Sequence, residues 1–351
     1  MDRMWHPDEF LKKLYAEQEQ ERKRLLDEPW DKRRTRLRAK LGELLGEFKV
    51  SGELAPKLLE RVELPEHGLV RERVEYTTAE GLRVPAYVVL PQATEGKRLP
   101  AVLAWHGHGY GSRESVGLLT DGSVREGAPG IHNDFALELA KRGVVVLLPE
   151  IVGFGDRKLQ QDLAQDPGIG NSCFSIGAAL LLAGKTIAGL RVYEARRAVD
   201  YLAARPEVDA ERIGGMGFSG GGMVASLHGA VDDRVKATVL CGYPNTYESS
   251  ILARRHCLDN YIPGVLPYAE MPDLLALLAP RPLFIESGDE DHLFPAETVK
   301  EVISKLRSLY TQLEAGERFA FDIFEGKHEI KGRYSYDWLT TVLRSTDGSI
   351  H

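Results

Sequence analysis

Cysteine is scarce in this chain of 351 residues, which contains only Cys173, Cys241 and Cys257. So few cysteines, odd in number and without metal-ligand spacing, argue against a disulfide framework and favour buried free thiols in a reducing compartment. Long apolar runs are also missing, because no stretch reaches the roughly 18 residues of a membrane span. The first residues lack the basic and then apolar pattern of a signal peptide. We therefore expect a soluble, cytoplasmic protein with no membrane partner.

An excess of basic charge is lacking as well. The formal net charge is -7 and the isoelectric point is about 5.9, whereas a nucleic-acid surface needs a concentrated basic face. One basic run lies at residues 32–38, but acidic residues flank it closely. This pattern favours a solvated helix face over a nucleic-acid or membrane site, so we expect no nucleic-acid partner.

Residues 1–62 are dense in charge and carry two apolar stripes at helical spacing. They predict an N-terminal helical arm that packs on the main domain or on a second subunit, which would make the protein a homo-oligomer. The stripes consist of Phe10, Leu11, Leu14 and Tyr15, and of Leu37, Leu41, Leu44, Leu45 and Phe48.

Residues 63–351 are expected to form one catalytic domain. Two alternating runs joined by a turn predict an antiparallel hairpin, and short, nearly continuous apolar runs then alternate with helical stretches. This order predicts an α/β fold with a doubly wound, mostly parallel sheet. The expected strands are 70–76, 82–90, 101–105, 144–148, 212–216, 235–241, 282–285 and 319–324, and the expected helices are 134–141, 187–202, 223–231, 296–309 and 336–343.

The sequence Gly217-Phe218-Ser219-Gly220-Gly221 follows one of these strands and opens a helix. A nucleophile elbow needs this context, because its serine sits on a strained strand-to-helix turn and the residues two before and two after it must lack side chains. The backbone N–H of Gly220 would lie at a helix N-terminus, where it can hold a developing oxyanion. Ser219 is therefore the candidate nucleophile.

The same letters also spell G-x-G-x-x-G over residues 215–220, the pattern of a dinucleotide-binding turn. That interpretation requires an acidic residue at the end of the next strand, to hold the ribose hydroxyls. The next strand, 235–241, is followed by Gly242, Tyr243 and Pro244 and offers no carboxylate. The pattern therefore favours the elbow, and a glycine-rich turn without chemistry is the plain structural alternative.

Further polar residues follow other strands, at the sheet edge where α/β sites form. Strand 101–105 leads into His106-Gly107-His108-Gly109, and we expect the amide of His108 to supply a second oxyanion donor. Strand 282–285 leads to Asp291, and strand 319–324 leads to His328. The chain order Ser, Asp, His is the order that this architecture uses.

Each residue type suits a step of acyl transfer. A neutral imidazole can take the serine proton and return it to the leaving group, and His328 is the expected base because it follows the last strand. A carboxylate must orient that imidazole, and Asp291 is preferred over Asp289 and Glu290 because it lies deeper in the loop. Asp322, within a strand, is the weaker alternative for this role. The competing histidines are His228, His256 and His292.

His106 and His108, with His132 and Asp134, suggest a metal site, but the spacing of metallo-hydrolases is absent and an oxyanion loop is favoured, so no metal is expected. Residues 151–185 and 241–279 are two insertions on the site side of the sheet. The tyrosines there are by default packing residues, yet these insertions are where we expect the substrate pocket.

The chain resembles the α/β-hydrolase superfamily, in its branch of dienelactone-hydrolase-like and acetyl-xylan-esterase-like enzymes, over about residues 65–345. Besides the elbow, the resemblance rests on three motifs in the expected order. These are Gly153-Phe154-Gly155-Asp156-Arg157, then Tyr201-Leu202 with Arg205-Pro206-Glu207-Val208-Asp209, and then Ala279-Pro280-Arg281-Pro282-Leu283.

This resemblance implies a hydrolase of carboxylic esters that acts on a small-molecule ester, with Ser219, Asp291 and His328 at the matching positions and no cofactor. Dienelactone hydrolases use a cysteine nucleophile, so the serine favours the esterase side of the branch. The expected substrates are short acyl esters or acetylated carbohydrates. A peptidase or amidase of the same fold is an alternative, and a non-catalytic binding module on this scaffold is a second one.

Overall fold

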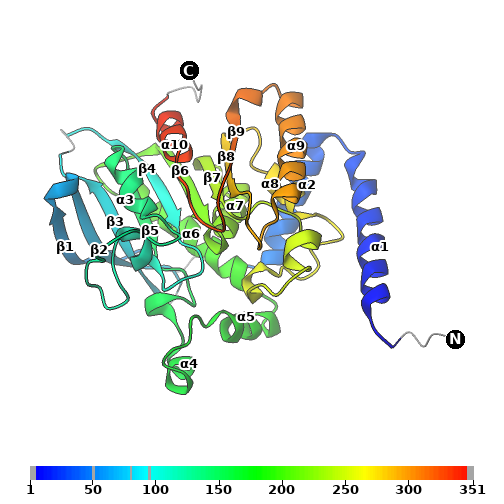
Figure 1. The fold of residues 1–351 in the computed structure, drawn as a ribbon, viewed down its shortest axis with the longest axis horizontal. Coiled ribbons are helices and arrows are strands. Elements are labelled where there is room, and N and C mark those ends of the chain that lie inside the picture. The colour runs from blue at the N-terminus through cyan, green and yellow to red at the C-terminus, as the bar shows by residue number, and fades with distance from the viewer. Residues whose placement is uncertain (1–4, 50–51, 80, 94–95, 346–351) are drawn as a thin grey trace.

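One nine-stranded sheet forms the centre of the molecule (Figure 1), in a computed structural model that describes residues 5–49, 52–79, 81–93 and 96–345. The strand order is β1-β2-β3-β5-β4-β6-β7-β8-β9. The strands are β1 (Lys57–Leu64), β2 (Leu69–Thr77), β3 (Arg83–Pro91), β4 (Leu99–Trp105), β5 (Val145–Pro149), β6 (Val208–Phe218), β7 (Val235–Cys241), β8 (Leu283–Gly288) and β9 (Phe319–Phe324).

The sheet is antiparallel at one edge and parallel through the rest. Strands β1, β2, β3 and β5 pair antiparallel in that order, whereas β5, β4 and β6 to β9 pair parallel. In the parallel part β5 is buried along its whole length and β4 is buried beyond its first residue, because helices cover both faces. The carboxyl ends of these parallel strands meet at one edge, and this edge holds the site described below.

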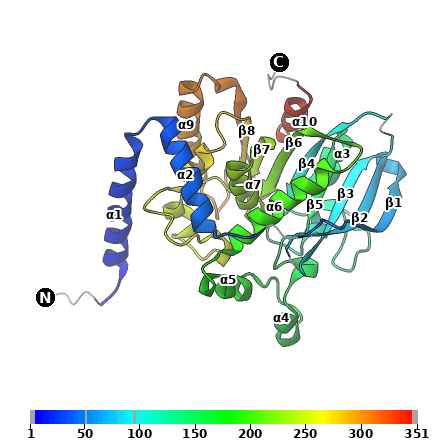
Figure 2. The same cartoon turned by 180° about the vertical axis from the view of Figure 1, so that it is seen from behind.

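Two hydrophobic layers flank the sheet (Figures 1 and 2) and confirm the predicted doubly wound α/β fold. One layer contains α3 and α10, and the other contains α6, α7, α8 and α9. The helices of the catalytic domain are α3 (Phe135–Lys141), α4 (Gln160–Gln165), α5 (Cys173–Leu182), α6 (Ile187–Ala203), α7 (Gly220–Val231), α8 (Met271–Ala276), α9 (Ala296–Gln312) and α10 (Ser335–Arg344).

The second helix of the N-terminal arm packs on this domain. Figure 2 shows α2 (Trp30–Leu45) lying across α6 and α7. Leu37, Leu41 and Leu45 are at most 6% exposed and belong to the main core. Arg38 forms an ion pair with Asp233 at 2.8 Å beside the end of α7. The apolar stripe of α2 is therefore buried within the chain itself.

The first helix, α1 (Asp8–Leu26), is held mainly by polar contacts. Tyr15 donates a hydrogen bond of 3.0 Å to Glu270, and Arg22 donates one of 2.7 Å to the carbonyl of Leu266. Its apolar stripe stays in solvent, so the expectation that this arm joins a second subunit stays a prediction. The exposed members are Phe10 at 66%, Leu11 at 55% and Leu14 at 41%.

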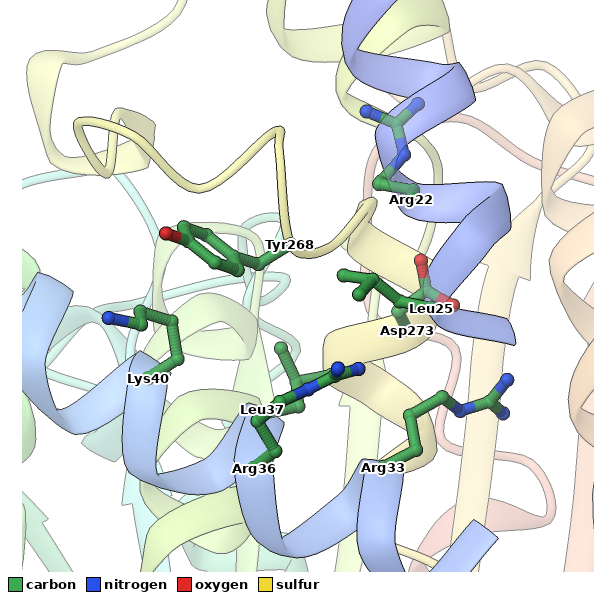
Figure 3. Close-up of a pocket in the computed structure, with 8 residues that line it drawn as sticks. All are labelled: Arg22, Leu25, Arg33, Arg36, Leu37, Lys40, Tyr268 and Asp273. Carbon is green, nitrogen blue, oxygen red and sulfur yellow. The ribbon is translucent and has the colours of Figure 1, made fainter. Parts of the chain in front are cut away.

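A small pocket lies where α1, α2 and the segment around Tyr268 meet (Figure 3). Its volume is about 20 Å³, which is close to the space of one water molecule. Lys40 stands 5.1 Å above the ring of Tyr268. A space of this size is a small gap between the arm and the domain rather than a ligand site. The lining residues are Arg22, Leu25, Arg33, Arg36, Leu37, Lys40, Tyr268 and Asp273.

The boundary of the helical arm differs from the expectation. Residues 57–62, which were assigned to the arm, belong to β1, and β1 pairs antiparallel with β2. Their side chains are almost all exposed, so they carry no clear burial pattern that would reveal a strand.

Within the described part of the chain, no single helix has the length and apolar character of a membrane span. Only α5 and α6 taken together meet that test of length and composition, and they are bent by 99°.

The docking of α2 predicts that Leu41 contributes to the stability of the whole domain. Leu41→Ala should lower the free energy of unfolding by about 2–5 kcal/mol, because it leaves a cavity in a buried core. Leu11→Ala, which truncates a leucine that is 55% exposed, is the matched control and should change it by less than about 0.5 kcal/mol. Urea denaturation measures both values, and equal small effects would contradict the docking of α2.

Candidate active site

Ser219 lies on the turn between β6 and α7, at the carboxyl edge of the sheet. Its backbone has φ 53° and ψ -119°, a left-handed conformation that is strained for a residue with a side chain. A Cβ at Gly217 would lie 2.1 Å from the carbonyl oxygen of Gly221, and a Cβ at Gly221 would lie 2.0 Å from that of Trp105. Only glycine fits both positions, which is the requirement of a nucleophile elbow.

Ser219, His328 and Asp291 form one hydrogen-bonded row. The Oγ of Ser219 is 2.9 Å from Nε2 of His328, and Nδ1 of His328 is 2.7 Å from Oδ2 of Asp291. The other carboxylate oxygen of Asp291 accepts the backbone N–H groups of Leu293 at 2.8 Å and Phe294 at 3.0 Å. The structure thus brings together three residues that stand up to 109 positions apart in the chain.

The alternative acids lie elsewhere. Asp289 and Glu290 are exposed, and Asp289 accepts the backbone N–H of Gly326 at 3.0 Å. Asp322 forms an ion pair with Arg333 at 2.6 Å. Asp291 is only 4% exposed and is the carboxylate that contacts His328.

The competing histidines also have other neighbours. His228 is buried inside α7, 3.3 Å from Asp232, where burial lowers the pKa of its imidazole against the opposing effect of Asp232. The Nε2 of His256 is 3.2 Å from the hydroxyl of Ser250. His292 is exposed. The structure places His328 alone among the four within hydrogen-bond distance of Ser219.

The loop after β4 is braced from behind by a second histidine. The N–H of Gly107 donates a hydrogen bond of 2.9 Å to Nε2 of His132, whose Nδ1 lies 3.1 Å from Glu114. Burial lowers the pKa of His132, although Glu114 opposes this effect. The ring is therefore held neutral, as its role of acceptor requires. The amide of Gly107 is therefore already used as a donor within this loop.

A buried carboxylate supports the start of the same loop. Glu150 is fully buried directly after β5, accepts hydrogen bonds from Ser112 at 2.9 and 2.7 Å, and lies 3.3 Å from His106. Burial alone would raise its pKa, but His106 and Ser112 together lower it to about 2. Sequence reasoning missed Glu150 and Glu114. For Glu150 a signal exists, since it is a charged residue at the end of an apolar strand.

A pocket of about 730 Å³ opens beside Ser219 and Gly220. Both insertions named from the sequence contribute to it, residues 151–185 through Asn171 and Phe174 and residues 241–279 through six others. Its charged and titratable lining consists of Arg255, three imidazoles, the thiol of Cys257 and the phenol of Tyr261, and no carboxylate is among the lining residues. The lining residues are His108, Ile131, Asn171, Phe174, Ser219, Gly220, Arg255, His256, Cys257, Leu258, Asn260, Tyr261, Leu293, Phe294 and His328.

The metal site considered from the sequence does not assemble. His106 and His132 pair with Glu150 and Glu114, and Asp134 forms an ion pair with Arg125. His108 instead lies near Cys257 and Asp259, and no sequence pattern connects these two residues with it.

Comparison with known proteins defines the family. A family model described as "Dienelactone hydrolase family" matches residues 128–326, more than half of the chain. The chain belongs to the dienelactone hydrolase family. The matched span contains Ser219 and Asp291 and ends just before His328. Membership confirms the expected resemblance and a hydrolase of carboxylic esters, and it decides against the dinucleotide-binding interpretation.

Individual relatives agree with this family. The chain is 31% identical to YtaP of Bacillus subtilis (strain 168), a protein assigned as a hydrolase, over 79% of this chain and 88% of that protein. A crystal structure from Bacteroides fragilis, assigned as an acetyl xylan esterase, is 18% identical with a TM-score of 0.67 and coverage of 83% and 74%. A glucuronoyl esterase from Solibacter usitatus is 15% identical with a TM-score of 0.62 and coverage of 89% and 92%. At these identities the two structures establish the shared fold.

The lowered pKa of Glu150 predicts a specific pH dependence of stability. A carboxylate whose pKa is lower in the folded than in the unfolded protein stabilises the fold above its unfolded pKa of about 4.5, and this contribution is lost as the pH falls toward 2. Glu150→Gln should therefore cost most stability at pH 6–7, and the gap to the wild type should narrow in acid. Urea denaturation at a series of pH values measures the gap, and a gap that widens below pH 4 would contradict the ionised state of Glu150.

Proposed function

We propose that Ser219 forms an acyl-enzyme with a carboxylic ester and that His328 and Asp291 drive both halves of the reaction. The observation that carries this proposal is the row of 2.9 and 2.7 Å contacts that joins the three side chains at the end of the sheet. Such a row gives the serine hydroxyl a base within hydrogen-bond reach and gives that base a fixed orientation.

In the first half, Nε2 of His328 takes the proton of Ser219 while Oγ forms a bond to the ester carbonyl carbon. Asp291 accepts the Nδ1–H of His328 and stabilises the imidazolium that results. The imidazolium then protonates the departing alkoxide, and the C–O bond to the alcohol breaks. In the second half, His328 activates a water molecule in the same way, and hydrolysis releases the acid and restores Ser219.

The oxyanion is assigned to the backbone N–H groups of Gly220 and His108. Gly220 is the first residue of α7, so its N–H belongs to the positive end of that helix. The choice of His108 is supported by the preceding amide, which is already bound to His132. Preorganised donors of this kind stabilise the tetrahedral intermediate more than the substrate.

The proposed substrates are short acyl esters, including acetylated carbohydrates. The pocket combines aromatic side chains, among them Phe174 and Tyr261, with amide groups of Asn171 and Asn260. Rings that cover apolar sugar faces and amides that bind hydroxyls are a suitable lining for a carbohydrate. Of the two structures that share the fold, the acetyl xylan esterase acts by its name on an acetylated carbohydrate, and the glucuronoyl esterase acts by its name on glucuronoyl esters. Hydrolysis of acetylated xylo-oligosaccharides, compared with p-nitrophenyl esters of increasing acyl length, measures this preference.

The assignment of the nucleophile predicts covalent labelling at one residue. A fluorophosphonate probe should modify the wild-type protein at Ser219, because the neighbouring base activates only that hydroxyl. Ser219→Ala should remain unlabelled under the same conditions. Mass spectrometry of the peptides identifies the site. A folded wild-type protein that is not labelled, or a label on another serine, would contradict the proposal.

The assignment of the base predicts a large difference between two histidine variants. His328→Ala should lower kcat for p-nitrophenyl acetate by roughly 10⁴-fold or more, as loss of a triad member does in other hydrolases. His292→Ala is the matched control, because His292 is exposed and adjoins Asp291 in the chain, and it should change kcat by less than about threefold. Steady-state kinetics measure both. A large loss in His292→Ala with activity retained in His328→Ala would overturn the assignment.

A further inference from the structure

Three potential metal ligands meet at the wall of the catalytic pocket. One donor atom each of His108, Cys257 and Asp259 can be chosen so that all lie within 4.8 Å of one another. His108 comes from the loop after β4, whereas the other two come from the 241–279 insertion. His108 and Cys257 also line the pocket beside Ser219, so the cluster can be reached from the site.

The imidazole of His108 is incompletely satisfied in this position. Its Nε2 is buried and makes no hydrogen bond with the described residues. The carboxylate oxygen Oδ2 of Asp259 lies 3.7 Å away, which is too far for a hydrogen bond. The thiol of Cys257 also interacts with this imidazole, so a buried nitrogen without a well-formed hydrogen bond faces a thiol and a carboxylate, which are both metal-ligand types.

We propose that His108, Cys257 and Asp259 bind a divalent transition-metal ion, with Zn²⁺ as the best fit. Zinc prefers imidazole nitrogen, thiolate sulfur and carboxylate oxygen in a tetrahedral arrangement, at about 2.0–2.3 Å from the metal. Donor atoms in such a site are about 3.3–3.8 Å apart, so each of these donors moves inward by less than about 1 Å. The thiol of Cys257 releases its proton to solvent when the S–Zn bond forms.

Residues behind the cluster are suited to support such an ion. Arg191 forms a buried ion pair with Asp259, and its other nitrogen lies 3.1 Å from the sulfur of Cys173. A hydrogen-bonded carboxylate is common among metal ligands, because its outer partner fixes its orientation. The three protein donors leave the fourth tetrahedral position of the ion to a water molecule.

The proposed metal site lies next to the proposed reaction centre, because His108 belongs to both. A Cβ on Gly220 would lie 2.9 Å from Cε1 of His108, so the ring stands directly beside the first residue of α7. A bound ion would hold this ring beside the proposed oxyanion donors, the amides of Gly220 and His108. That connection rests on the proposed function, whereas metal binding itself does not.

The test uses the full-length protein, reduced and then freed of metal with a chelator. Titration with Zn²⁺ against a chromogenic competitor should show one ion bound per chain. Substitution with Co²⁺ should add a near-ultraviolet thiolate-to-cobalt absorption band. Cys257→Ser should weaken Zn²⁺ binding by at least about tenfold and remove the band, because it replaces the thiolate ligand. Cys241→Ala is the matched control, since Cys241 lies buried in β7 outside the cluster, and it should retain both signals.

Several results would overturn the site. The proposal is wrong if the wild-type protein fails to bind one Zn²⁺ per chain. It is also wrong if Cys257→Ser binds Zn²⁺ with the same affinity as the wild type. Loss of affinity in His256→Ala with affinity retained in Cys257→Ser would place the ion on other pocket histidines. If Cys257→Ser does not fold by circular dichroism, His108→Gln replaces it as the loss variant. Binding with the cobalt band in a protein that lacks esterase activity would support the metal site and contradict the proposed function instead.

Discussion

The close approach of three backbone segments around Ser219 is the constraint on which the rest of the site depends. The end of β6, the end of β4 and the start of α7 touch through Gly217 and Gly221, where any side chain would overlap a carbonyl oxygen. This contact holds Ser219 in a strained, left-handed conformation and directs its hydroxyl toward His328. It also places the first amide of α7 beside the reacting position. The position of the proposed nucleophile is thus a product of backbone packing rather than of its own side chain.

Pairs of a histidine and a carboxylate hold the loops that surround this turn. His328 with Asp291, His106 with Glu150 and His132 with Glu114 all lie at the carboxyl edge of the sheet. A buried imidazole or carboxylate is costly without a partner, so each pair fixes the position of the two segments that supply it. Only the first pair contacts the nucleophile. The same pairing of a histidine with a carboxylate therefore supports the proposed reaction in one place and the loop after β4 in the others.

Much of this arrangement can be predicted from residue patterns. Every expected strand and helix of the catalytic domain is present, because buried strands and amphipathic helices have strong periodic signals. The proposed triad residues Ser219, Asp291 and His328 could be predicted because each lies in the segment that follows a strand. Strand β1 was not predicted because its side chains are mostly exposed. It is held as a strand by its backbone pairing with β2, which leaves no burial pattern in the sequence. Glu114 was not predicted either, because its partner His132 lies 18 positions away in a segment without regular structure.

The sequence by itself determined the strands other than β1, the glycines of the elbow, and the serine and histidine of the proposed triad. These features depend on the spacing of residues that are close together in the sequence. Only the tertiary structure decided which of several carboxylates faces His328, which amide of the loop after β4 is already used, and that His108, Cys257 and Asp259 share one wall of the pocket. Such contacts join segments separated by up to about 150 residues, and their geometry is set by packing, which no local pattern encodes.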